Sequence, residues 1–217
     1  EVASEMAVQI VSRELHELND VYGEAARLRV AESLRIANRA IYDRTIQESD
    51  KQGMGTTASV LVMSGARYLI GQVGDSRVYL LRDGALRQLT KDHSYVQEQV
   101  DAGFLTPEQA RYHPYSNVIT RCVGASDVVE PDTYSGELKV GDVFLVAPDG
   151  LTGMVDDRRR QPLLLARASA GRVVDALIAE ANYRGGLDNI TAIVVQVLQI
   201  DSPNADAPTQ EGPAFGA

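Results

Sequence analysis

The chain has 217 residues, of which 44% are hydrophobic and 24% are charged. This balance is typical of a folded protein with a substantial core. The formal net charge of -9 argues against a nucleic-acid backbone or an anionic membrane surface as the main partner. No apolar run approaches the length of a membrane helix and no signal peptide is visible, so we expect no membrane insertion of this segment.

The single cysteine, Cys122, cannot form an intrachain disulfide, which favours a reducing compartment and a cytoplasmic location. Since no cysteine-enzyme signature surrounds it, we interpret Cys122 as a small buried hydrophobe rather than a nucleophile.

The first part of the chain has helical periodicity. Apolar residues at helical spacing predict amphipathic helices over about residues 2–18 and 24–48, separated by Asn19-Asp20 and Gly23. From Gly53 the period changes to that of strands, with turn residues between short apolar runs. Four strands are predicted there: 58–63, 67–73, 76–81 and 85–89. Because their connections are short, we expect one antiparallel meander, with Gly74-Asp75 as a hairpin turn.

The second half alternates between helix and strand. Residues 95–117 predict a helical excursion over the sheet, with Thr106 to Gln109 as a capping box. His93 and His113 are far apart and no cysteine pair accompanies them, so we favour ordinary surface or hinge histidines over a zinc site. Strands are expected at 117–123, 128–134, 142–147 and 190–200, and a helix at 171–184, after a segment at 161–170 to which no element is assigned. Residues 201–217 lack periodicity and are rich in Pro, Gly and Ala, which predicts a disordered tail or linker.

Three aspartates share a local pattern at strand ends. Asp75 follows Gly74, Asp149 precedes Gly150, and Asp188 opens the last strand next to Asn189. Hard divalent cations such as Mg²⁺ or Mn²⁺ prefer oxygen donors, and a pair of such ions can activate a water and clamp a phosphoryl group. Asp-Gly is also common turn chemistry. Spacing alone therefore leaves a turn role and a metal role open.

Several motifs, in order, carry a family resemblance. The chain contains Gly53-Met-Gly-Thr-Thr57, Gly74-Asp-Ser-Arg77, Leu89-Thr-Lys-Asp-His-Ser94, Asn117-Val-Ile-Thr-Arg121, Asp149-Gly-Leu151 and Gly185-Gly-Leu-Asp-Asn-Ile-Thr191. Over about residues 1–200 this series resembles the PPM (PP2C-like) metal-dependent protein serine/threonine phosphatases of bacterial type. The resemblance implies an α+β fold: an α-β-β-α four-layer sandwich of two antiparallel sheets flanked by helices, here without its first strands.

The resemblance also implies a site and a reaction. Asp149 and Asp188 would be ligands of two core Mn²⁺ or Mg²⁺ ions, and Asp75 would contribute to a more weakly held third ion. Gly150 and Asn189 would support the metal loops. A metal-bound hydroxide would attack phosphoserine or phosphothreonine in a protein directly, so no side-chain nucleophile is expected. Residues 95–117 would be the flap that tunes substrate choice.

Partners follow from the same resemblance. The expected partners are phosphorylated proteins, including a serine/threonine kinase, and no nucleic acid, with the chain acting as a monomer. Arg77 would anchor a loop rather than grip phosphate, and Thr56, Thr57 and Ser76 would be structural.

Two departures from the family pattern bear on these expectations. The family's Asp-Gly-Met-Gly-Gly turn, whose Asp bridges the core metals, is not in the sequence. Glu1-Val-Ala-Ser4 resembles the segment directly after that turn, so we expect an N-terminally truncated phosphatase domain over 1–200. Pro148 replaces a small polar residue before Asp149 and removes a backbone donor. Without the bridging carboxylate, we expect this fragment to hold the metal pair poorly. The alternatives are an inactive fragment, a non-catalytic binding or regulatory module of the same fold, and a phosphatase of anti-sigma-factor antagonists.

Overall fold

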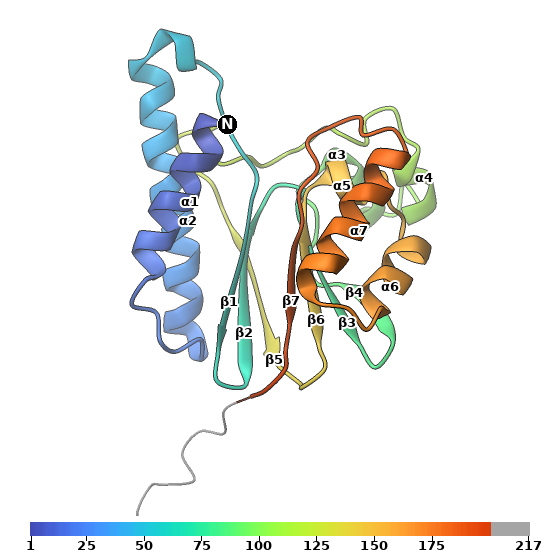
Figure 1. The fold of residues 1–217 in the computed structure, drawn as a ribbon. Coiled ribbons are helices and arrows are strands. Elements are labelled where there is room, and N and C mark those ends of the chain that lie inside the picture. The colour runs from blue at the N-terminus through green and yellow to red at the C-terminus, as the bar shows by residue number, and fades with distance from the viewer. Residues whose placement is uncertain (201–217) are drawn as a thin grey trace, which may run out of the picture.

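Two long helices form the first layer of the protein. The computed structural model describes residues 1–200, and in it α1 (Val2–Leu15) packs beside α2 (Gly23–Gln47) on one outer face (Figure 1). A short 3₁₀ turn, η1 (Ser49–Lys51), follows α2. Both helices predicted from the apolar periodicity are confirmed.

Two antiparallel sheets form the middle layers. The first has the strand order β1-β2-β5 and the second the order β4-β3-β6-β7. The strands of the first sheet are β1 (Ala58–Ser64), β2 (Arg67–Val73) and β5 (Asp132–Glu137). Those of the second are β3 (Arg77–Arg82), β4 (Ala85–Gln88), β6 (Val143–Ala147) and β7 (Ile193–Gln196). As predicted, β6 is a central strand.

The prediction of one four-stranded meander is wrong, because the chain changes sheets at Gly74-Asp75-Ser76. β2 pairs with β1 and β5, whereas β3 pairs with β4 and β6. The buried Gln72 side chain donates to the carbonyls of Gly74 (3.0 Å) and Ser76 (2.6 Å), which fixes a crossover in place of a hairpin. Asp75 therefore lies between the two sheets' strand ends rather than at the tip of a hairpin.

Alternating side chains of the central strands fill three apolar layers. Tyr68 and Ile70 of β2 pack against Phe144 and other residues of the second sheet. The intervening Leu69 packs against α2. On the second sheet, residues such as Leu145 contact α6 and α7 instead. Because both faces of these strands are covered, their sequences are continuously apolar. The predicted α-β-β-α four-layer sandwich is confirmed.

The flap leaves the second sheet as two short helices, α3 (Tyr95–Asp101) and α4 (Pro107–Arg111), and α4 begins with the predicted capping box of Thr106 and Gln109. The strand predicted at 117–123 is wrong. Its residues make only the isolated bridges Ser94–Ile119 and Thr56–Val123, because they join the flap to other loops rather than to a strand.

The last part of the chain covers the second sheet. α5 (Asp149–Thr152), α6 (Asp157–Leu165) and α7 (Ala170–Tyr183) form the outer layer opposite α1 and α2 (Figure 1). α6 begins where Asp156 caps it by accepting from the Arg159 amide, and it includes the first part of the segment 161–170, for which no element was predicted. The strand predicted at 128–134 starts later, and the one at 190–200 is shorter. The predicted tail, 201–217, lies outside the described residues.

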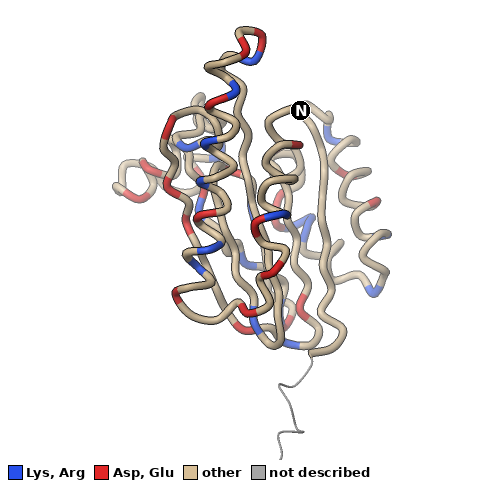
Figure 2. Tube along the Cα trace, turned by 90° about the vertical axis from the view of Figure 1, so that its left-hand side faces the viewer, with Lys and Arg blue, Asp and Glu red and all other residues tan. Residues whose placement is uncertain are grey.

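Charged residues are interleaved over the surface. Figure 2 shows acidic and basic positions following one another along the helices. Several form pairs within one helix, including Arg39 with Asp43 and Arg44 with Glu48. Such exposed pairs contribute only a few tenths of a kcal/mol each. Within residues 1–200, no helix combines the length and the apolar character that a membrane crossing requires.

Candidate metal centre

Three neighbouring loops carry the predicted aspartates. Asp75 lies in the crossover after β2, Asp149 opens α5 directly after β6, and Asp188 lies in the loop between α7 and β7. The charge of Asp149 acts on Asp75. A Cβ atom added to Gly150 would lie 3.2 Å from Asp188 Cβ, so the Asp149 turn and the Asp188 loop are in contact.

Gly150 and Asn189 make the close approach of these two loops possible. A Cβ atom at Gly150 would lie only 2.3 Å from the Asn189 backbone oxygen, so only glycine fits here. Pro148 is the N-cap of α5, with φ -75° and ψ 172°, a φ that the proline ring favours. Its carbonyl accepts from the amides of Leu151 and Thr152. Pro148 therefore fits the turn that presents Asp149.

No cationic side chain of the described residues neutralises the three carboxylates. Asp149 Oδ1 accepts from the Gly150 amide at 2.8 Å, and Asp188 Oδ1 accepts from the Asn189 amide at 2.6 Å. Within residues 1–200, none of the three aspartates forms an ion pair with Lys, Arg or His. Burial, and then the repulsion of Asp149, raises the pKa of Asp75 to about 6. An added cation would relieve this repulsion.

The donor chemistry suits a hard divalent cation, since all three side chains offer carboxylate oxygens. In the part of the chain that the structure describes, no three side chains of His, Cys, Asp and Glu gather closely enough to form a metal cluster. The described aspartates thus fit as part of a ligand set, completed by other oxygen donors such as water.

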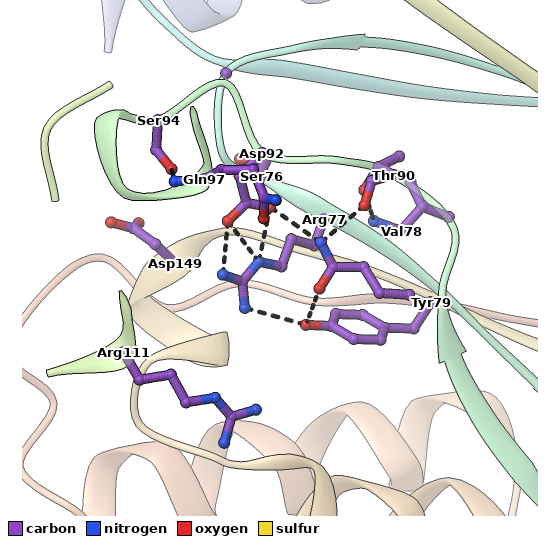
Figure 3. Close-up of polar contacts among 12 residues, drawn as sticks. Ser76, Arg77, Val78, Tyr79, Thr90, Asp92, Ser94, Gln97, Arg111 and Asp149 are labelled. Atoms are coloured by element: carbon purple, nitrogen blue, oxygen red, sulfur yellow. Dashed lines mark hydrogen bonds and ion pairs between the residues drawn. The ribbon is translucent and has the colours of Figure 1, made fainter. Parts of the chain in front are cut away.

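A polar network beside the site holds Arg77. Its guanidinium donates to both carboxylate oxygens of Asp92, at 2.9 and 2.6 Å, and to the Tyr79 hydroxyl at 3.2 Å. Figure 3 shows this network next to Asp149, with Arg111 of the flap on its other side. Because the guanidinium of Arg77 is already bound to the Asp92 carboxylate, Arg77 anchors the loop of Asp92 rather than binding phosphate, as predicted.

The remaining polar residues of the quoted motifs are structural in the way predicted. The hydroxyl oxygens of Thr57 and Ser76 lie 2.8 Å apart and join β1 to the crossover. Cys122 is half-buried, its thiol donates to the Thr56 carbonyl, and burial raises the pKa of the thiol. A protonated thiol is a poor nucleophile.

The histidine interpretation needs one correction. His93 is not a surface residue: it is only 4% exposed and its Nδ1 accepts from the Gly74 amide at 3.1 Å. Sequence reasoning missed this contact because His93 and Gly74 are far apart in the chain. The motif Thr90-Lys-Asp-His-Ser94 could have indicated it, because this run of polar residues lies in the connection between β4 and α3, outside both elements.

The four-layer sandwich, with acidic side chains in the loops after its central strands, is the architecture that the ordered motifs predicted. The sequence profile described as Protein phosphatase 2C matches residues 1–179. The serine/threonine phosphatase stp of Listeria welshimeri is 37% identical over 204 residues, which are 90% of this chain and 78% of that protein. The chain belongs to the protein phosphatase 2C family, as its motifs predicted.

Solved structures agree with this assignment. The Mycobacterium tuberculosis serine/threonine phosphatase PstP/Ppp has a TM-score of 0.81 and 36% identity, covering 91% of this chain and 83% of that one. A catalytic domain of PstP in complex with two manganese ions has a TM-score of 0.80 and 33% identity, covering 91% of this chain and 81% of that one. That relative therefore binds manganese ions.

Proposed function

We propose that the chain hydrolyses phosphoserine and phosphothreonine in proteins with the help of Mn²⁺ or Mg²⁺. The observation that carries the proposal is that the charge of Asp149 acts on Asp75 and that the Asp149 turn touches the Asp188 loop, with no cationic side chain paired to the three aspartates within residues 1–200. In this proposal Asp149 and Asp188 are ligands of two core ions, and Asp75 belongs to a more weakly held third ion.

The bound ions would supply Lewis acidity toward the phosphoryl oxygens and a water of lowered pKa. The chain's own residues would keep the ligands of these ions in place. Gly150 and Asn189 keep the loops of Asp149 and Asp188 together by the close approach described above. The Arg77–Asp92 pair fixes the start of β3, directly after Asp75. The flap, 95–117, borders this end of the sheets and would select substrates.

The proposal extends to the organisation and setting of the protein. Residues 1–200 would be the phosphatase domain, acting as a monomer in the cytoplasm on phosphorylated proteins that include a serine/threonine kinase. The names of relatives such as the stp and PstP phosphatases support a protein substrate.

The test compares hydrolysis of p-nitrophenyl phosphate and of a phosphothreonine peptide by the wild-type chain and by Asp149→Asn, over a titration of Mn²⁺ and of Mg²⁺. Asp149→Asn should lower kcat/KM by about 100-fold or more, since even residues that only support a metal ligand change activity by roughly 10–100-fold. Asp156→Asn is the matched control: Asp156 also opens a helix, and asparagine caps equally well. Hydrolysis that persists in EDTA, or an Asp149→Asn variant of full activity, would contradict the proposal. Mn²⁺ binding by calorimetry with no hydrolysis would favour a non-catalytic binding module.

A further inference from the structure

His93 forms hydrogen bonds with both the backbone amide and the backbone carbonyl of Gly74. Its ring nitrogen Nδ1 accepts from the Gly74 amide at 3.1 Å, and its own backbone amide donates to the Gly74 carbonyl at 2.9 Å. The ring is almost fully buried. One residue therefore fixes both the amide and the carbonyl of Gly74, directly before Asp75.

The far side of the imidazole is fixed as well. Its Nε2 lies 3.4 Å from Asp132 Oδ2 and 3.3 Å from Arg121 Nη1, and the same Arg121 nitrogen donates to Asp132 Oδ1 at 2.9 Å. Because Nδ1 accepts an amide proton, the ring proton must lie on Nε2, where Asp132 can accept it. Burial, followed by the charge of Arg121, lowers the pKa of His93 and favours this neutral form.

The turn itself has little freedom. Gly74 has a φ of +100°, and a Cβ atom added there would lie 2.4 Å from the Thr57 methyl carbon. Glycine is the residue that adopts this positive φ readily, but it adopts negative φ values just as easily. Gly74 therefore does not by itself select this conformation. Its peptide must be held by neighbours, and His93 and Gln72 are the side chains that bind it.

His93 also lies at the base of the flap. Its carbonyl accepts from the Thr120 amide at 2.8 Å, and the Tyr95 amide donates to the Val118 carbonyl at 2.9 Å. The two ends of the flap thus meet at the residue that holds the Gly74-Asp75 turn.

We propose that His93 is a positioning residue for the phosphatase reaction. By binding the amide and the carbonyl of Gly74, His93 sets the direction in which the chain leaves β2 and thereby orients Asp75 toward Asp149. His93 also joins this turn to the base of the flap. The proposal rests on the proposed role of Asp75 as a ligand of a divalent cation. It assigns His93 no contact with substrate or with the ion.

The experiment compares His93→Leu with His93→Asn in the full chain. Asparagine places an amide oxygen close to the position of Nδ1 and can still accept from Gly74, whereas leucine fills the space without an acceptor. His16→Leu is the control, because His16 is an exposed histidine at the end of α1, outside the flap.

Two measurements are made on each variant. Hydrogen exchange of the Gly74 amide by NMR, in EDTA, should accelerate at least about tenfold in His93→Leu and remain within about threefold of wild type in His93→Asn. The Mn²⁺ concentration for half-maximal hydrolysis of p-nitrophenyl phosphate should rise about tenfold in His93→Leu, in the range seen when a ligand's support is removed. His16→Leu should change neither quantity.

Equal effects of His93→Leu and His93→Asn on the Mn²⁺ dependence would overturn the proposal, as would an equal effect of His16→Leu. So would faster Gly74 exchange with an unchanged Mn²⁺ dependence. If His93→Leu does not fold, the contrast between His93→Asn and His93→Gln replaces it, because glutamine cannot place an acceptor at Nδ1. If even the wild-type chain neither binds Mn²⁺ nor hydrolyses phosphate, the proposed function fails, and the positioning role of His93 fails with it. The Gly74 exchange then still tells whether the hydrogen bond forms.

Discussion

Replacing Asp75 by asparagine should stabilise the cation-free protein at neutral pH. Burial and the repulsion of Asp149 raise the pKa of Asp75 from 3.8 to about 6. The ionised carboxylate is therefore disfavoured in the folded state. Asparagine has nearly the same shape and no charge, and its oxygen can still accept a backbone hydrogen bond. The ionised Asp75 carboxylate would thus lower the free energy of unfolding, a cost that functional sites often carry.

The magnitude follows from the size of the pKa change. A rise from 3.8 to about 6 corresponds to about 3 kcal/mol, since one pKa unit is about 1.4 kcal/mol. Asp75 is only half-buried, and solvent screening reduces this to about 1–2 kcal/mol. Between pH 3.8 and about 6 the folded state binds more protons at Asp75 than the unfolded state does. Its contribution to stability therefore falls as the pH rises through this window and stays low above it.

Urea unfolding in EDTA, at pH 8 and at pH 4, measures the effect. The free energy of unfolding of Asp75→Asn should exceed that of wild type by about 1–2 kcal/mol at pH 8, and the gain should be much smaller at pH 4. Asp149→Asn should give a smaller gain at pH 8, because its repulsion is the second cause and burial the first. The exposed Asp127→Asn is the control and should change little.

An Asp75→Asn variant that is no more stable than wild type at pH 8 would refute this reasoning. A gain of equal size at both pH values would also refute it, because the effect would then come from packing rather than from charge.

Two further substitutions test the geometry of the site and of the outer layer. Gly150→Ala would force its Cβ against the Asn189 carbonyl, 2.3 Å away. It should raise the half-saturating Mn²⁺ concentration about tenfold in the p-nitrophenyl phosphate assay, and an unchanged Mn²⁺ dependence would contradict the contact. Arg160 is buried, lies 4.2 Å over the Tyr79 ring, and has two side-chain nitrogens without a hydrogen-bond partner in the part of the chain described. Arg160→Met should therefore change the free energy of unfolding by less than about 1 kcal/mol in urea, whereas Arg160→Ala should lower it by about 2–4 kcal/mol, and equal losses would contradict this account.

The sequence predicted most of the secondary structure, because its signals are local. The helical spacing in α1 and α2, the capping box of Thr106 and Gln109, and the apolar run of β6 each depend on neighbours a few residues apart. The strand at 117–123 was predicted wrongly because strand formation depends on residues that are distant in the sequence. Its β-favouring residues join loops through isolated bridges, and only the tertiary neighbours decide whether an extended segment becomes a strand.

From the sequence alone, apolar periodicity predicted the helices and most strands, a shared pattern at strand ends picked out the three candidate aspartates, and the family resemblance of the ordered motifs implied the fold class. Only the tertiary structure decided that Gly74-Asp75 is a crossover between sheets, that Asp75 and Asp149 repel each other, and that His93 holds the Gly74 peptide. A short Gly-Asp connection is compatible with a hairpin and with a crossover. The choice is made by strands β5 and β6, which come much later in the chain and pair with β2 and β3.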